Sequence, residues 1–231
     1  MFVAAGWGAG LGVVIWILDD DAQRTMEALD SFRPKLGSKV YSGDGELLGQ
    51  FAIESREYVA LNEIPLTLQK AFLATEDDEF YDHRGFRPLA LANAAVDSLR
   101  TGNVRGASTI TQQVVRNVDQ TGISKDVTVQ RKLKEIVYAL QLERSYTKDE
   151  ILEIYLNQVF LGVTAYGVKA AAAQYFSKDV WDLTLGECAM LAGLTRSPNN
   201  NNPFRSPKNA ITRRNIVLLQ MLENGLITQE E

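Results

Sequence analysis

The sequence has few of the residues on which disulfide and metal chemistry depend. Among its 231 residues there is one cysteine, Cys188, and one histidine, His83. A single cysteine excludes an intramolecular disulfide, and one cysteine with one histidine excludes the cluster that a zinc site needs. Cys188 lies in the apolar run 188–192. We therefore expect it to be a small core residue rather than a reactive thiol.

The chain also lacks an excess of positive charge. Lys and Arg number 24 against 29 Asp and Glu, so the formal net charge is −5 at pH 7. Nucleic-acid-binding domains present a basic face, so this balance argues against nucleic acid as a partner but permits a local basic pocket for phosphate. The hydrophobic content of 45% is ordinary for a globular protein. The length is sufficient for one large domain or two closely packed lobes.

The first residues contain no charge until an acidic cluster. The run 2–18 is almost wholly apolar and ends at Asp19. Its length is at the short end of the roughly 17–25 residues that span a bilayer. No Lys or Arg precedes it, and no small-x-small cleavage site is evident. We predict an uncleaved transmembrane anchor at 1–18, a linker at 19–37 and an extracytoplasmic domain at 38–231; the alternative for the anchor is a buried core helix.

Local signals predict a mainly α domain with one β hairpin near its start. Two β-rich stretches flank a Ser-Gly-Asp-Gly turn within residues 39–51, and beyond Pro65 the pattern is helical. Capping boxes predict three helix starts, at Thr109, Thr147 and Thr184. Ser206-Pro207 and Asn224-Gly225 predict the two ends of a last helix.

Residues 76–85 hold five carboxylates and the histidine. Glu76 follows the apolar run 71–75, so we expect it at the end of a helix and partly buried. Partial burial and neighbouring negative charge both disfavour the ionised form of a carboxylate, which suits a general base. The alternative is a solvated acidic loop. For His83 a structural hydrogen bond is favoured over proton transfer.

Residues 106–113 open a predicted helix with polar side chains suited to an anion. The hydroxyls of Ser108 and Thr109 lie at its N-terminus, where the backbone donors and the dipole favour negative charge. Gln112 and Gln113 add amide donors, and Arg116 is i+4 from Gln112. Capping alone does not explain the paired glutamines, so ligand binding is favoured over a solvated polar face.

A third cluster, Arg131-Lys132-Leu133-Lys134-Glu135, is ambiguous by spacing alone. Arg131 and Glu135 share a helix face at i, i+4, and an exposed ion pair is the default expectation. An apolar stripe with i, i+3, i+4, i+7 spacing predicts that the opposite face is the buried one. Its members are Leu133, Ile136, Val137 and Leu140.

Together these stretches resemble the family 51 peptidoglycan glycosyltransferases. The stretches 76–85 and 106–113 match the first two family motifs, and Arg131, Lys132 and Glu135 match the third. Residues 151–157 and 187–203 resemble the fourth and fifth regions. The chain departs from the family pattern at Arg87, Asn93 and Arg105, which puts substrate affinity or rate in question rather than the type of reaction.

The resemblance implies a lysozyme-like, two-lobed helical fold and an inverting glycosyl transfer. The donor is a glycan strand on undecaprenyl pyrophosphate, and the acceptor is the 4-hydroxyl of lipid II at the bacterial cytoplasmic membrane. Glu76 is then the base, and Glu135 manages the departing pyrophosphate, with or without a divalent cation (Mg²⁺ or Mn²⁺). The implied substrate-binding residues are Asp77, Phe80, His83, Ser108, Thr109, Gln112, Gln113, Arg116, Arg131, Lys132 and Asn157.

Two other functions remain open from the sequence. A glycoside hydrolase also uses two carboxylates, but it has no pyrophosphate for the Arg–Lys cluster to hold. A non-catalytic module that recruits other cell-wall synthesis proteins is the second. No Ser-x-x-Lys transpeptidase pattern is present. Because residues 39–64 resemble the segment that precedes this domain in bifunctional penicillin-binding proteins, we expect a truncated bifunctional enzyme rather than a one-domain one.

Overall fold

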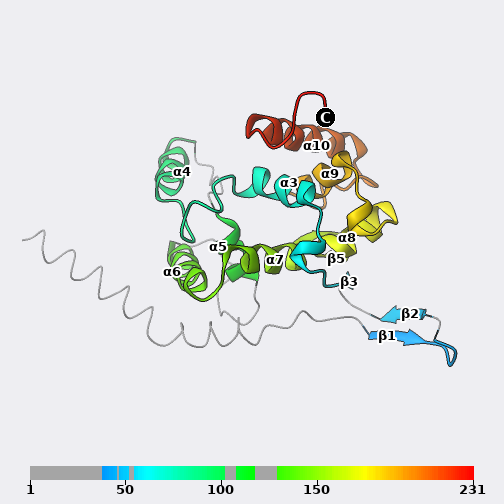
Figure 1. Cartoon of the computed structure of the whole chain (residues 1–231). Helices are drawn as coiled ribbons and strands as arrows, with labels where there is room; N and C mark the ends of the chain where they lie inside the picture. Colours follow the sequence, from blue (N-terminus) through cyan, green and yellow to red (C-terminus); the bar gives the residue numbers. More distant parts are fainter. Residues whose placement is uncertain (1–37, 46, 52–54, 102–107, 118–128) are drawn as a thin grey trace, which may run out of the picture. The chain divides into compact units, whose positions relative to one another are not determined.

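The computed structural model describes residues 38–45, 47–51, 55–101, 108–117 and 129–231 (Figure 1). The predicted anchor and linker lie outside these residues. Within them, no helix has the length and apolar character needed to cross a membrane. The described residues form two compact units: unit 1 comprises 83–148, and unit 2 comprises 38–82 together with 149–231. Both are mainly helical, which confirms the mainly α part of the predicted fold class.

Unit 2 begins with the predicted hairpin. Strands β1 (Ser38–Tyr41) and β2 (Leu47–Phe51) pair antiparallel, with Ser38 opposite Phe51. In the turn between them Gly45 has a φ of +89°, a conformation that glycine adopts without strain. A second, three-stranded sheet was not predicted. Its order is β3-β5-β4, with β5 (Ala165–Tyr166) parallel to β3 (Ser55–Arg56) and antiparallel to β4 (Phe160–Gly162).

Three helices of unit 2 pack together: α3 (Leu66–Glu76), α9 (Leu185–Leu194) and α10 (Pro207–Glu223). Their shared core is fully buried and consists of Leu68, Phe72, Leu191, Val217 and Met221. The rest of unit 2 comprises α7 (Lys148–Gln158), α8 (Val168–Phe176) and two 3-10 turns, η1 (Leu61–Glu63) and η3 (Val180–Asp182).

The predicted helix ends in unit 2 are confirmed. Thr184 accepts a hydrogen bond from the Glu187 amide, while the Glu187 carboxylate accepts from the Thr184 amide at 2.8 Å. Pro207 occupies the first turn of α10, and Gly225 follows its end with a φ of +66°. Cys188 is buried within α9 as predicted, and burial raises the pKa of its thiol to about 12.

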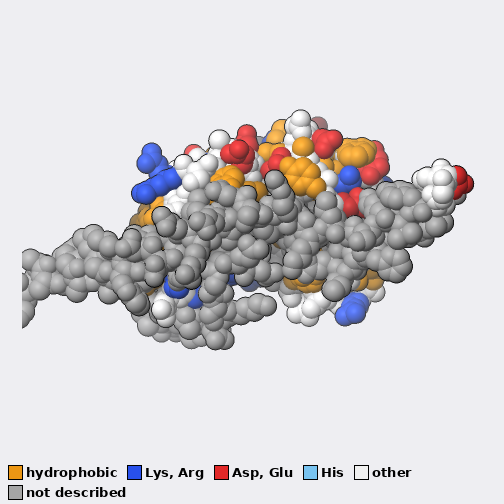
Figure 2. Space-filling view, turned by 90° about the horizontal axis from the view of Figure 1, so that it is seen from below, with side chains coloured by type: hydrophobic (Ala, Val, Ile, Leu, Met, Phe, Trp, Pro, Cys, Tyr) orange, Lys and Arg blue, Asp and Glu red, His pale blue; other side chains and the backbone are white. Residues whose placement is uncertain are grey.

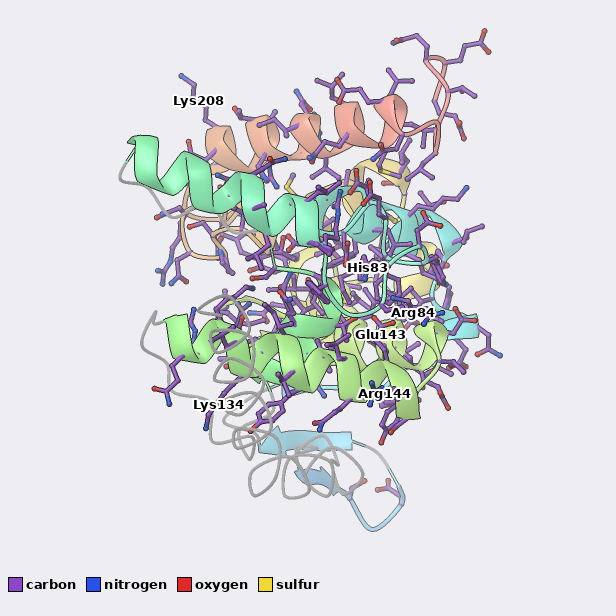
Figure 3. All side chains as sticks on the ribbon, turned by 90° about the vertical axis from the view of Figure 1, so that its left-hand side faces the viewer. His83, Arg84, Lys134, Glu143, Arg144 and Lys208 are labelled. Atoms are coloured by element: carbon purple, nitrogen blue, oxygen red, sulfur yellow. The ribbon has the colours of Figure 1, made fainter. Side chains whose placement is uncertain are left out.

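Unit 1 contains α4 (Pro88–Thr101), α5 (Ile110–Asn117) and α6 (Val129–Ser145), and α5 packs on α6. Thr111 of α5 donates to Glu143 of α6 at 2.6 Å, and Lys148 donates to the same carboxylate oxygen at 2.7 Å. Glu143, labelled in Figure 3, therefore ties α5 to α6 and to Lys148 within unit 1. On the surface shown in Figure 2, acidic, basic and apolar side chains of the described residues are interspersed.

The apolar face predicted for α6 was wrong. Leu133 is 43% exposed, and the other three residues of that stripe are only half-buried. The buried residues of α6 are instead Glu135, Tyr138, Ala139 and Leu142, which have the same spacing on a different face. The ion-pair face turns inward because α5 supplies polar partners for its charges.

Candidate active site

The acidic stretch begins where α3 ends, at Glu76. Asp77 caps the helix, and its amide donates to the Leu73 carbonyl at 2.9 Å. The Phe80 amide then donates to the Asp77 carbonyl at 3.1 Å, and the Phe80 ring is buried. Glu76 is half-buried and Asp77 is buried, so neither belongs to a solvated loop. The other three acids of the stretch are exposed, as expected for a solvated loop: Asp78, Glu79 and Asp82.

Within unit 2, two residues that the sequence analysis did not single out lie beside Glu76. The hydroxyl of Thr195 donates to Glu76 Oε1 at 2.5 Å. Burial and the charge of Arg196 lower the pKa of Arg213, while the Glu76 carboxylate acts in the opposite direction. Thr195 lies in the 187–203 segment that resembles the fifth family region, and this was the available signal for it.

In unit 1, the end of the first motif lies against the start of the second. Gly85 has a φ of +83°, and a Cβ at this position would lie 2.9 Å from the backbone carbonyl of Ala139 in α6. Thr109 Oγ1 donates to the Gly85 carbonyl at 2.7 Å. Glycine is therefore required where this loop meets α6. The half-buried His83 precedes it in the same loop (Figure 3).

The N-terminus of α5 forms the predicted capping box. The Gln112 amide donates to Thr109 Oγ1 at 3.2 Å, and the Thr109 amide donates to Gln112 Oε1 at 3.4 Å. Both side chains are about 1% exposed, so their polar atoms hold the helix end together. Ser108, Gln113 and Arg116 are half-buried and thus more open to a ligand.

Lys132 connects the second motif to the third. Its ammonium donates to Gln112 Oε1 at 2.7 Å and to Ser108 Oγ at 2.9 Å, and it pairs with Glu135 Oε2 at 3.2 Å. An ammonium has three hydrogens, so these three acceptors hold it in one place. The sequence-predicted residues of these two motifs are therefore brought together within unit 1.

Glu135 is fully buried beneath this cluster. Its other oxygen, Oε1, pairs with Arg131 Nε at 3.3 Å. Burial lowers the pKa of Lys132; Glu135 opposes that effect, and the charges of Arg116 and Arg131 add to it. The charges of Arg116 and Arg131 therefore act on Lys132 beside the buried carboxylate of Glu135. We call Arg116, Arg131, Lys132 and Glu135 the cation cluster.

The cation cluster does not fit a resident metal ion. Hard divalent cations bind carboxylate and carbonyl oxygens, whereas both oxygens of Glu135 are already paired with Arg131 and Lys132. Across the part of the chain that the structure describes, no group of three or more His, Cys, Asp or Glu side chains is placed to hold a metal.

Asn157 is the predicted binding residue that is most deeply engaged in the fold. Its Oδ1 accepts from the Val59 amide at 2.9 Å. Its Nδ2 donates to the carbonyls of Val59 and Glu153, at 2.9 and 2.8 Å. Asn157 is buried, and these bonds fasten residue 59 to α7. A contact between Asn157 and substrate stays a prediction.

Comparisons with known proteins show the family to which the chain belongs. A family model described as Transglycosylase matches residues 44–222. Penicillin-binding protein 1A of Aquifex aeolicus (strain VF5) is 46% identical over 204 residues, which cover 88% of this chain and 28% of that protein. The Escherichia coli (strain K12) protein of the same name is 47% identical over 88% of this chain and 24% of its own length. The chain thus spans about a quarter of these relatives.

A solved structure shows the same similarity. The crystal structure of penicillin-binding protein 1A from Haemophilus influenzae is 30% identical in sequence and superimposes with a TM-score of 0.50. The match covers 86% of this chain and 20% of that one.

Proposed function

Because this chain belongs to the transglycosylase family, we propose that it polymerises lipid II into linear peptidoglycan strands. The reaction is an inverting glycosyl transfer from a strand held on undecaprenyl pyrophosphate to the 4-hydroxyl of lipid II. The relatives carry the name penicillin-binding protein 1A and are between three and four times as long as this chain. Activity, substrates and partners of the whole protein are part of this proposal.

The cation cluster is the observation that carries the proposal. A leaving pyrophosphate gains negative charge as the glycosidic bond breaks, and fixed cations stabilise that charge in the transition state. Three acceptors already hold the Lys132 ammonium in place, so little free energy is needed to reorient it during the reaction. We assign Arg116, Arg131 and Lys132 to the pyrophosphate and Glu135 to holding two of them in place. The cations replace the divalent ion that the resemblance leaves open.

Glu76 acts as the general base. It removes the proton of the 4-hydroxyl, and the freed electron pair of the oxygen forms the new bond to C1 of the donor sugar. The bond from C1 to the pyrophosphate breaks, and the pyrophosphate leaves with its electron pair. A base in reach of the attacking hydroxyl contributes about 10²–10⁴-fold to such a reaction.

The cation cluster also favours a transferase over the two alternatives. A hydrolase of finished strands releases no pyrophosphate, so three mutually repelling cations would have no role there. A recruitment module needs neither the cluster nor a half-buried Glu76. Both substrates are lipid-linked, so attachment to the extracytoplasmic face of the cytoplasmic membrane would raise their effective concentration.

The test is polymer formation from labelled lipid II by detergent-solubilised protein, followed on gels. We expect polymer from the wild type and a fall of about 10²–10⁴-fold in Glu76→Gln, which removes the base but keeps its shape. Glu79→Gln is the matched control, because Glu79 is an exposed acid in the same loop. Polymer from Glu76→Gln at the wild-type rate would contradict the role of Glu76. Absence of polymer from folded wild type would contradict the function itself.

A further inference from the structure

The hydroxyl of Thr195 lies between two acceptors. Thr195 caps the C-terminus of α9, and its Oγ1 is 2.5 Å from Glu76 Oε1 and 2.8 Å from the Ala192 carbonyl oxygen. A hydroxyl has one proton to donate and can accept hydrogen bonds with its lone pairs. Thr195 can therefore donate to only one of these two oxygens at a time.

We propose that Thr195 is a positioning residue that holds the Glu76 carboxyl in both of its protonation states during catalysis. The inference rests on the proposed function, in which Glu76 takes up a proton. While Glu76 is a carboxylate, Thr195 donates to Oε1. The same bond persists if the incoming proton binds Oε2. If the proton binds Oε1, Glu76 donates to Thr195, which turns its own proton to the Ala192 carbonyl.

This arrangement matters because Glu76 is half-buried. A buried polar group without a partner costs more than the bond itself is worth. When the proton binds Oε1, that oxygen changes from acceptor to donor, so a neighbour that could only donate would lose its hydrogen bond in that state. The Ala192 carbonyl offers the Thr195 hydroxyl a second acceptor for its hydrogen bond. Thr195 keeps its own proton throughout the reaction.

The surrounding helices fix Thr195 and complement the charge of Glu76. A Cβ on Gly193 would lie 3.0 Å from Arg213 Cγ, so α9 and α10 approach closely just before Thr195. Arg213 Nε is buried and finds no hydrogen-bond acceptor among the described residues. The Arg213 charge and the Glu76 charge stabilise each other. Glu76 therefore has a reversible hydrogen-bond partner in Thr195 and a favourable electrostatic interaction with Arg213.

The experiment compares Thr195→Val, which is nearly isosteric but lacks the hydroxyl, with Thr195→Ser, which retains it. Initial rates of lipid II polymerisation are measured across substrate concentration, which gives kcat and KM separately. We expect kcat to fall about 10- to 100-fold in Thr195→Val with KM little changed, the loss expected for a bond to a charged group. Thr195→Ser keeps near-wild-type kcat.

Thr212→Val is the matched control, since the Thr212 hydroxyl donates to the Lys208 carbonyl on an exposed part of α10. Thermal unfolding verifies that each variant is folded, and Thr195→Ala, with the same expected loss of kcat, replaces an unfolded Val variant. Wild-type kcat in Thr195→Val, or an equal fall in the Val and Ser variants, would overturn the inference while leaving the proposed function intact. Failure of the wild type to form polymer would overturn both.

Discussion

Removing the ammonium of Lys132 should destabilise the fold as well as the reaction. In Lys132→Met the aliphatic stem remains, but Ser108, Gln112 and Glu135 lose their shared donor. Breaking a buried ion pair costs about 3–5 kcal/mol. Lys132 is 25% exposed and Glu135 keeps its pairing with Arg131, so we expect about 2–3 kcal/mol. For a protein of this size that lowers Tm by about 4–12 °C.

A double-mutant cycle separates the interaction energy between Lys132 and Glu135 from the contributions of their other neighbours. Glu135→Gln alone leaves Lys132 without its counter-charge, whereas the variant that carries both substitutions has neither charge. We expect the double variant to be less destabilised than the sum of the single ones, by about 1–3 kcal/mol. Urea unfolding followed by circular dichroism measures each free energy of unfolding. Lys208→Met, at an exposed position on α10, is the control and should lie within about 0.5 kcal/mol of wild type.

Additivity of the two substitutions within about 0.5 kcal/mol would refute this reasoning, because it would mean that the two charges do not interact. A Tm unchanged in Lys132→Met would refute it as well. In either case the ammonium would not be held in place for a leaving pyrophosphate.

Two further predictions concern backbone strain and alkaline pH. At Gly167 (φ +83°) a Cβ would lie 2.7 Å from the Asn157 carbonyl oxygen, whereas at Gly225 (φ +66°) nothing lies within 4 Å. Gly225→Ala should cost about 1–2 kcal/mol of unfolding free energy and Gly167→Ala clearly more; equal losses in urea unfolding would contradict this. The pKa of Tyr58 is raised to about 12 by a hydrogen bond to a carboxylate, and that of Tyr81 to about 12 by burial. Their contribution to stability is present below pH 10 and is lost as pH rises through about 12. The Tyr58→Phe, Tyr81→Phe double variant should lose less stability over that interval; an identical loss would contradict the assignment.

The sequence predicted those features whose cause is local. The Thr184 capping box and the Pro207 start of α10 each depend on a few neighbouring residues, so the printed sequence was sufficient. The same holds for the hairpin within residues 39–51. The sequence indicated each residue of the cation cluster separately, but the geometry of the cluster depends on α5 packing on α6.

What the sequence could not predict depends on contacts between distant segments. The periodicity predicted that Leu133 lies on the buried face of α6 and that the ion pairs lie on its exposed face. The reason is that a hydropathy pattern treats a charged residue such as Glu135 as exposed. Burial of Glu135 becomes favourable only with Arg131 and Lys132 beside it. Thr195 carries no chemical signal of its own, and only the folded chain shows its hydroxyl at Glu76.

The two-part construction of unit 2 has a consequence for the order in which the chain folds. Unit 1 is a continuous stretch within the described residues, and Lys132 lies 20 residues from Gln112 in sequence. Glu76 and Thr195 are 119 residues apart, so a much longer loop must close before they meet. During synthesis from the N-terminus, unit 1 with its cation cluster can form while Glu76 is still without its hydrogen-bond partner Thr195. Under the proposed function, the surroundings of Glu76 would therefore be completed only with the late helices α9 and α10, after the cation cluster has formed.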